Sequence, residues 1–453
     1  MLPERFVERV VCELGSAEGG ALCRALEGEP PVSVRLNRAK GGAVSSGRPI
    51  GWSADGYWLD ARPSFTLDPD FHAGRYYVQE ASSQFVGRIV AACGGIEGGR
   101  VLDMCAAPGG KTTLYATLAG RDGLVVANEV VRNRAAVLAD NVRKWGLGNV
   151  AVTVEDPSRI ARLEGWFDVV AVDAPCSGEG MFRKDPDARG EWSEGNVKQC
   201  AARQDEILRE AWRALRPGGT LVYSTCTFNR DEDEGALERM AAWAGDEIAE
   251  SEETAVEDAW GIVCGRVGAF RTFRFYPHRT CGEGFFAAVA RKSFDAGGRV
   301  RTPKARRTVF AAVDRKTAGE LARWVRNPGG MHFAAVADTC YAWYAAQADA
   351  VRTLSEALPV IYSGVALGQV FKGVLKPDPA LAFFDGLNRG ALPAAELDDE
   401  ETLRFLRRQD IAAGGLAEGM NLVCSRGRAL GFAKRIGARV NNLYPNSLRI
   451  IKQ

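Results

Sequence analysis

The segment from Val101 to Thr113, VLDMCAAPGGKTT, constrains the fold of this chain more than any other. A short apolar run ends in Asp103, small residues follow from Ala106 to Gly110, and a helical pattern begins at Thr112. This order predicts a strand, a tight loop and a helix, with glycines where the backbone approaches a ligand and free N–H groups at the helix start. The loop matches neither G-x-G-x-x-G nor G-x-x-x-x-G-K-[ST], so it does not favour a nicotinamide or a nucleoside triphosphate.

Strand and helix patterns alternate from this segment onward. The apolar runs predict five strands, with helical patterns between them and a Pro-Gly-Gly turn (Pro217 to Gly219) before the fifth: Val101–Met104, Leu124–Asn128, Ala151–Val154, Phe167–Val172 and Thr220–Ser224. Such alternation is typical of an α/β domain with a doubly wound, Rossmann-like parallel sheet. In these sheets ligands bind beyond the carboxyl ends of the strands.

Acids and cysteines follow the ends of the predicted strands. Glu129 comes after the second strand, Asp156 after the third, Asp173 and Cys176 after the fourth, and Cys226 after the fifth. Because the carboxyl ends of parallel strands meet at one edge of a sheet, we expect these side chains to lie together. Three acids and two cysteines at one edge predict a functional site rather than packing alone.

Two of the acids have a role suggested by their position. Glu129 lies 20 residues after Gly109, where an acid accepts hydrogen bonds from ribose hydroxyls. Asp156 is suited to the amine or ring edge of an adenine, but an N-cap of the following helix is an alternative. Asp173-Ala-Pro-Cys176 places a carboxylate and a thiol on one turn stiffened by proline.

The composition narrows the class of protein. At 453 residues, with 46% hydrophobic and 25% charged residues, the chain has the size of about three domains and the composition of a soluble protein. No apolar run is long enough to span a membrane and no signal peptide opens the chain, so we expect a cytoplasmic protein without a membrane partner. The 11 cysteines form no C-x-x-C pair and only three histidines occur, so no metal site is expected.

Residues 1–75 predict a small α/β domain with a helix from Leu2 to Leu26 and a strand from Val32 to Leu36. Aromatic residues after this strand, near Arg35 and Arg38, could stack on single-stranded nucleic acid, although core and edge packing is the commoner use: Trp52, Tyr57, Trp58 and Phe65. A further helix is expected from Gln79 to about Ala92, at the start of a central domain spanning residues 76–293.

The C-terminal half carries strong charge asymmetry. Twelve acids against two arginines between Arg230 and Asp258 predict a solvated acidic helix that faces away from RNA. Phe270–Tyr276 and Phe285–Ala290 predict a hairpin with His278 at its turn. Residues 294–307, with five basic residues from Arg299 to Arg307, predict a linker. Residues 308–371 predict an intermediate α/β segment.

The C-terminal end of the chain is basic. Its last fifty residues hold ten Lys and Arg against two acids, with Asn441, Asn442 and Tyr444 interleaved. A basic run is often only a solvated face, but this mixture favours contacts with RNA phosphates.

Several motifs together resemble the Fmu/Sun family of RNA cytosine-5 methyltransferases. DMCAAPGGKTT, ANEVVRNR, VDAPCSGEGMFRKD, RPGGTLVYSTCTF and FRFYPHRTCGEGFFAAVARK stand in the order and spacing of that family, and LPERFVERV and GRYYVQEAS are also similar to it. DAPCSGEGMFRKDP and LGFAKRIGARVNNLYPNSLRI resemble its RsmF-like branch, which acts on small-subunit ribosomal RNA in bacteria. The resemblance is weakest from about residue 295 to 420.

The resemblance implies a site and a cofactor. Cys226 would be the nucleophile that adds to C6 of the target cytosine, Cys176 would assist its release, and Asp173 would hold the N3/N4 edge of the base. Lys111 would contact the target nucleotide, with a role in the helix start as the alternative. S-adenosylmethionine would be bound by the loop, by Lys111 and by three acids; the implied set is Cys105, Ala106, Ala107, Pro108, Gly109, Gly110, Lys111, Glu129, Asp156 and Asp173.

The resemblance also implies the partners of the protein, and it leaves two alternative functions open. It implies a PUA-like RNA-binding domain at residues 372–453, RNA contacts for residues 1–75, and ribosomal RNA or the small ribosomal subunit as substrate of a monomeric enzyme. A transfer-RNA methyltransferase and a non-catalytic ribosome assembly factor are the alternatives. A DNA cytosine methyltransferase is disfavoured, because its nucleophile would be the Pro-Cys thiol and a second cysteine would be unnecessary.

Overall fold

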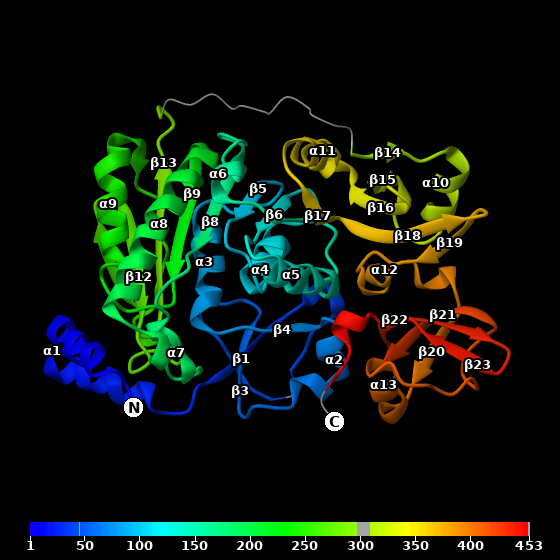
Figure 1. Cartoon of the computed structure of the whole chain (residues 1–453), viewed down its shortest axis with the longest axis horizontal. Coiled ribbons are helices and arrows are strands. Elements are labelled where there is room, and N and C mark those ends of the chain that lie inside the picture. The colour runs from blue at the N-terminus through cyan, green and yellow to red at the C-terminus, as the bar shows by residue number, and fades with distance from the viewer. Residues whose placement is uncertain (45, 297–308, 452–453) are drawn as a thin grey trace.

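The computed structural model describes residues 1–44, 46–296 and 309–451. Four sheets organise it, and Figure 1 shows the largest of them at the centre and left, with a smaller N-terminal sheet below it and two more on the right. The basic run from Arg299 to Arg307 lies outside the described residues. The expected domain limits stay predictions.

The central sheet has ten strands, with β10 beside β13 and the others in the order β11-β12-β13-β9-β8-β5-β6-β7-β17. Its middle five strands are parallel and match the predicted ones to within a few residues, except that β9 begins earlier: β5 (Arg100–Asp103), β6 (Leu124–Asn128), β7 (Val150–Thr153), β8 (Phe167–Asp173) and β9 (Leu215–Thr225). The remaining strands are antiparallel: β10 (Ile248–Ala249), β11 (Val263–Val267), β12 (Phe270–Phe275), β13 (Phe285–Lys292) and β17 (Val360–Ser363).

Helices cover both faces of this sheet. Alternate strand residues such as Val101 and Leu102 belong to opposite cores, as the period of two requires. One core packs against α3 (Phe85–Ala92), α4 (Gly110–Ala119) and α5 (Arg132–Trp145); the other packs against α6 (Pro157–Ile160), α8 (Glu194–Ala214) and α9 (Glu234–Ala244). The predicted doubly wound fold is confirmed.

The N-terminal part consists of a long helix and a four-stranded antiparallel sheet: α1 (Glu4–Leu26), β1 (Val32–Leu36), β2 (Arg48–Pro49), β3 (Gly56–Leu59), α2 (Pro69–His72) and β4 (Tyr76–Val78). The helix expected from Gln79 begins only at α3, after a 3-10 turn at Ser82–Gln84. The Glu80 carboxylate accepts hydrogen bonds from the N–H groups of Ser82 and Ser83, and so caps this turn. Trp52 and Trp58 are buried against each other, which favours the packing interpretation for these two aromatics.

The chain beyond residue 308 forms the two sheets on the right of Figure 1. The first contains β14 (Ala311–Ala312), β15 (Met331–Val336), β16 (Thr339–Tyr344), β18 (Val365–Phe371) and β19 (Val374–Pro377), with α10 (Arg315–Ala322) and α11 (Ala348–Ala357) beside it. The second contains β20 (Ala394–Leu397), β21 (Gly419–Ser425), β22 (Arg428–Ile436) and β23 (Arg439–Asn442), with α12 (Pro379–Phe383) and α13 (Asp399–Leu406). Strand β17 follows β16 and precedes β18 in the chain, but it does not join the first sheet. It pairs with β7 and so extends the central sheet.

Candidate active site

The loop between β5 and α4 begins at a buried carboxylate. Asp103 accepts a hydrogen bond from Thr112 Oγ1 at 2.6 Å through Oδ2, while its Oδ1 is buried without a partner among the described residues. Burial raises the pKa of Asp103 to about 7, and the neighbouring Asp173 adds to this rise. The loop therefore offers an unpaired acceptor to a ligand.

The glycines of the loop serve the turn itself. The helix begins at Gly110, two residues before the predicted start, and Gly109 precedes it at φ 111°, a conformation that favours glycine. A Cβ at Gly109 would lie 3.0 Å from Leu138 Cδ1 of α5. Gly109 thus faces α5 and lines neither of the cavities described below, unlike the other predicted loop residues.

A cleft of about 840 Å³ lies beyond the carboxyl ends of β5, β6, β7, β8 and β9, and α8 forms its opposite wall. Of the predicted site residues, the cleft is lined by Cys105, Ala107, Glu129, Asp156, Asp173, Cys176 and Cys226. A second cavity of about 160 Å³ is lined by Ala106, Pro108, Gly110 and Lys111, and shares Cys105, Ala107 and Asp173 with the cleft. The two cavities therefore meet at the same loop and carboxylate.

The two cysteines are neighbours at the ends of adjacent strands. Asp173 pairs with Ser224 in the parallel β8–β9 register, which brings the turns carrying Cys176 and Cys226 together. Their Sγ atoms are 3.3 Å apart, and both residues are free thiols. The contact with Cys226, together with burial, raises the pKa of Cys176 well above its ordinary value. Cys176 is therefore a thiol rather than a thiolate near neutral pH.

Lys111 and Asp173 form an ion pair beside these thiols. Lys111 Nζ lies 2.8 Å from Asp173 Oδ2, and Ser224 Oγ donates to Asp173 Oδ1 at 2.7 Å. Burial acts to lower the pKa of Lys111, but the charge and hydrogen bond of Asp173 outweigh it and leave the pKa above its ordinary value. Lys111 is thus a fixed positive charge at the site, and a charged Cys226 contributes to the same rise.

Glu129 and Asp156 both lie at the rim of the cleft. The Glu129 carboxylate is buried, accepts from Val131 N–H at 2.9 Å through Oε1, and has Arg134 Nη1 3.4 Å from Oε2. Asp156 is exposed and caps α6, accepting from the N–H and the hydroxyl of Ser158 at 3.0 and 2.6 Å. Those bonds lower the pKa of Asp156. The alternative N-cap role of Asp156 is therefore observed, and the residue also lines the cleft.

Three buried acids beneath the thiols were not anticipated from the sequence. Glu232 accepts from Ser177 N–H at 2.9 Å and from Gln204 Nε2 at 2.9 Å, which anchors the turn after Cys176. Glu179 accepts from Phe228 N–H, two residues after Cys226, and Asp233 accepts from Thr225 Oγ1. The predicted fully solvated acidic face is wrong for Glu232 and Asp233, which are inaccessible. Only their closeness in sequence to the STCT motif could have indicated this role.

Basic side chains on the cleft wall were also missed. Arg203 and Arg209 line the cleft from α8, and Arg134 lines it from α5. Arg134 also donates to Ala107 O of the loop at 3.1 Å. A helical spacing of arginines is common on solvated faces, so the sequence alone gave no reason to select these residues.

The site fits S-adenosylmethionine by its donor and acceptor chemistry. The ligand carries positive charge and ribose hydroxyls, and the cavities present the unpaired Asp103 Oδ1 and the Glu129 carboxylate as acceptors. The described residues place no group of three or more His, Cys, Asp or Glu side chains to hold a metal ion. Nor does any helix of the described ranges combine the length and apolarity that a membrane crossing needs.

A doubly wound sheet with this loop after its first strand and acids at the next strand ends defines a Rossmann-like methyltransferase domain. Three family models match the chain: "16S rRNA methyltransferase RsmB/F" over residues 95–291, "N-terminal domain of 16S rRNA methyltransferase RsmF" over 2–81, and "Methyltransferase RsmF PUA domain" over 393–450. The chain also resembles proteins named ribosomal RNA small subunit methyltransferase F. That of Erwinia tasmaniensis is 32% identical over 88% of this chain and 84% of its own, and that of Aeromonas hydrophila is 31% identical over 99% and 97%.

Solved structures agree with this likeness. A methyltransferase homologue from Pyrococcus horikoshii has a TM-score of 0.52 at 27% identity, covering 64% of this chain and all of its own. NSun6 from the same organism, solved with SFG, has a TM-score of 0.54 at 20% identity, covering 64% and 98%, and supports the fold alone. The chain belongs to the RsmF family of methyltransferases. Its cofactor is S-adenosylmethionine, as predicted.

Proposed function

We propose that this protein forms 5-methylcytosine in small-subunit ribosomal RNA through a covalent adduct with Cys226. The observation that carries the proposal is the pair of thiols 3.3 Å apart beside the Lys111–Asp173 ion pair, in a cleft that also meets the donor loop. The names of the relatives support the ribosomal substrate. We also propose that the enzyme works as a cytoplasmic monomer on ribosomal RNA or the small subunit.

The chemistry requires a nucleophile because C5 of cytosine is itself a poor one. The Cys226 thiolate adds to C6, and the electrons of the C5–C6 double bond make C5 an enamine carbon. S-adenosylmethionine would supply an electrophilic methyl group to that carbon, with the electrons of the broken S–CH3 bond staying on the sulfur, so that a neutral thioether leaves. A base then takes the C5 proton, the C5–C6 double bond re-forms, and the C6–S bond breaks to return the Cys226 thiolate.

The ion pair supports the first step. Lys111 places a fixed positive charge near Cys226. No histidine is placed to act as a base on Cys226, because none of His72, His278 and His332 lines the cleft. Asp173 would hold the N3/N4 edge of the base, with Lys111 fixing its Oδ2 and Ser224 its Oδ1.

Cys176 is placed for the last step. Its raised pKa arises first from the contact with Cys226. Once Cys226 has become a thioether, that neighbour carries no charge, so Cys176 can release its own proton to solvent more readily, and the resulting thiolate can accept the C5 proton. The change in the partner thus makes Cys176 a base only after the adduct has formed.

The remaining proposed residues hold the donor. The loop from Cys105 to Gly110 would surround it, Glu129 would accept hydrogen bonds from its ribose hydroxyls, and Asp156 would face its adenine. The target cytosine must leave its stack to reach the thiols, which costs a few kcal/mol.

Bisulfite sequencing of ribosomal and transfer RNA, with and without the gene, tests the proposal. We expect one or more cytosines of small-subunit RNA to lose their protection when the gene is deleted. Loss of protection in transfer RNA instead would identify the tRNA alternative. Unchanged patterns in both RNAs, with purified protein that binds S-adenosylmethionine but incorporates no methyl group, would indicate the non-catalytic alternative.

A further inference from the structure

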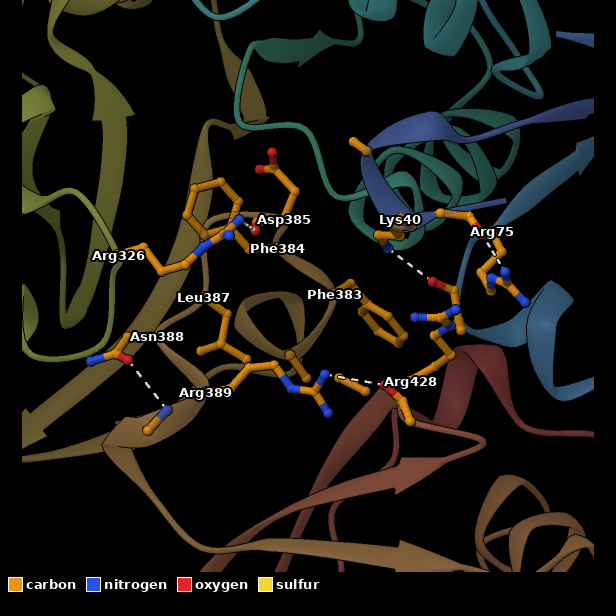
Figure 2. Close-up of a pocket in the computed structure, with 17 residues that line it drawn as sticks. Lys40, Arg75, Arg326, Phe383, Phe384, Asp385, Leu387, Asn388, Arg389 and Arg428 are labelled. Atoms are coloured by element: carbon orange, nitrogen blue, oxygen red, sulfur yellow. Dashed lines mark hydrogen bonds between the residues drawn. The ribbon is translucent and has the colours of Figure 1, made fainter. Parts of the chain in front are cut away.

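A further cavity, of about 530 Å³ and separate from the two at the active site, lies where three parts of the chain meet (Figure 2). The N-terminal part contributes residues 39–41 and Arg75, and the end of α12 with the loop after it contributes residues 382–385 and 387–390. Gly427 and the first two residues of β22 contribute the third part. It shares no lining residue with the catalytic cleft. Its volume is in the range of about 300–1,000 Å³ that is typical of ligand sites.

The lining of this junction pocket is strongly basic. Arg75, Arg326, Arg389 and Arg428 contribute to it, against the single carboxylate of Asp385. Figure 2 shows Arg326 on one side and Arg75 on the other, with Phe383 between them. Asp385 is already engaged, since Arg121 Nη2 lies 3.1 Å from its Oδ2 and the Tyr344 hydroxyl lies 3.3 Å from its Oδ1.

Three of these arginines have no neutralising partner among the described residues. Within the described ranges, Arg326, Arg389 and Arg428 form no ion pair. Arg326 and Arg389 donate to the carbonyl oxygens of Asp385 and Gly427, whereas the Nε of Arg428 is buried with no hydrogen-bond partner among the described residues. A buried donor left unpaired is costly, and together with three arginines that form no ion pair in the described part of the chain it favours an anionic ligand in the pocket.

Lys40 stabilises the wall of the junction pocket by hydrogen bonds and adds little to its lasting positive charge. Its Nζ donates to Ala73 O at 2.9 Å and to Lys144 O at 2.6 Å, which ties the N-terminal part to α5. Burial lowers the pKa of Lys40 to about 7. The lasting positive charge therefore comes from the guanidinium groups, which stay protonated at any working pH.

We propose that the junction pocket binds the phosphodiester backbone of the substrate RNA, away from the target cytosine. The planar guanidinium matches phosphate oxygens in geometry as well as charge. Small lining residues, Gly41, Gly390 and Gly427, leave room for a nucleic-acid backbone to approach. This inference rests on the proposed RNA substrate. Because the pocket joins the N-terminal part to the C-terminal sheet, one RNA segment would contact both.

The test compares Arg428→Gln with wild type. Arg428 is the best choice because its guanidinium makes no hydrogen bond or ion pair with the described residues, so its loss removes no internal contact of that group. Arg352→Gln is the matched control, since Arg352 is an arginine on α11 that lines neither the junction pocket nor the catalytic cleft. Binding of full-length small-subunit RNA transcript is measured at several salt concentrations, together with methyl incorporation and thermal unfolding.

We expect Arg428→Gln to weaken RNA binding about tenfold, which is the order of one charge-assisted hydrogen bond. The slope of log K against log salt should fall by about 0.7 to 0.9, as for one lost phosphate contact. KM for RNA should rise while kcat, donor affinity and unfolding temperature match those of wild type. Arg326→Gln combined with Arg428→Gln should lower the slope further.

If the double variant binds RNA with the affinity and salt slope of an active wild type, RNA binding at the junction pocket is ruled out and the proposed function stands. Weakened binding to the assembled subunit with unchanged binding to the free transcript would also overturn it, because the occupant would then be a ribosomal protein. A wild type that methylates no RNA would instead contradict the proposed function itself.

Discussion

Lys111 and Asp173 connect the donor loop to the two thiols. The sequence suggested their position, because Lys111 follows the glycine-rich turn and Asp173 ends a strand. It could not reveal that they pair with each other at 2.8 Å or that Ser224 completes the arrangement, since the first contact depends on β5 lying beside β8 and the second on the β8–β9 register. The same holds for the unpaired Oδ1 of Asp103, which results from burial.

Glu129→Ala tests the donor site at this scale. We expect S-adenosylmethionine binding to weaken by about 1–3 kcal/mol, because ribose hydroxyls would lose a buried acceptor. Glu129→Gln is the control, since its amide oxygen can still accept from Val131 N–H. Titration calorimetry gives both affinities. Equal affinity of Glu129→Ala and wild type would remove Glu129 from the ribose role.

Among the elements, the strands were predictable and the buried acids were not. Apolar runs and strand-end acids identify β5 to β8 because a parallel strand is buried on both faces. An acidic run, in contrast, is usually solvated, and this generalisation fails at Glu232 and Asp233. Their burial arises because the turns after β8 and β9 leave N–H and hydroxyl donors that need acceptors.

Glu232→Ala should loosen the turn that carries Cys176. Loss of the carboxylate leaves Ser177 N–H and Gln204 without their acceptor, at a cost of about 1–3 kcal/mol in the free energy of unfolding. Methyl transfer should slow more than donor binding weakens. Urea denaturation and single-turnover assays measure the two effects. Glu232→Gln, which keeps one acceptor oxygen, should lie between Glu232→Ala and wild type; full activity in Glu232→Ala would exclude the positioning role.

Across the whole molecule, contacts between segments far apart in the chain could not be predicted from the sequence. Strand β17 leaves its own segment to extend the central sheet, and α1 packs Phe6 against Phe182 and Trp192 near the active-site turns. His72 of α2 lies 3.1 Å from the Tyr444 hydroxyl and so joins the N-terminal part to the C-terminal one. No periodicity or motif encodes such pairings, which depend on the complementarity of folded surfaces.

His72 gives this contact a pH dependence. Burial lowers the pKa of His72 to about 4, while an unfolded histidine titrates near 6.5. Below pH 6.5 the unfolded state therefore binds a proton that the folded state does not, and the free energy of unfolding falls as the pH falls toward 4. Between pH 7.5 and 5 the loss from His72 should be about 2 kcal/mol.

Urea denaturation at both pH values measures this loss. His72→Asn should remove it and flatten the pH dependence relative to wild type, whereas His332→Asn, at an exposed position on β15, should not. A wild-type loss that persists in His72→Asn would assign the effect to other groups.

The covalent adduct with substrate RNA tests the central claim most directly. Wild type, Cys176→Ala and Cys226→Ala are incubated with RNA and S-adenosylmethionine and then run on a denaturing gel. Because attack and release need different thiols, Cys176→Ala should accumulate a shifted protein–RNA band, and Cys226→Ala should form no adduct and transfer no methyl group. An adduct in Cys226→Ala and none in Cys176→Ala would contradict the assignment of Cys226 as the nucleophile.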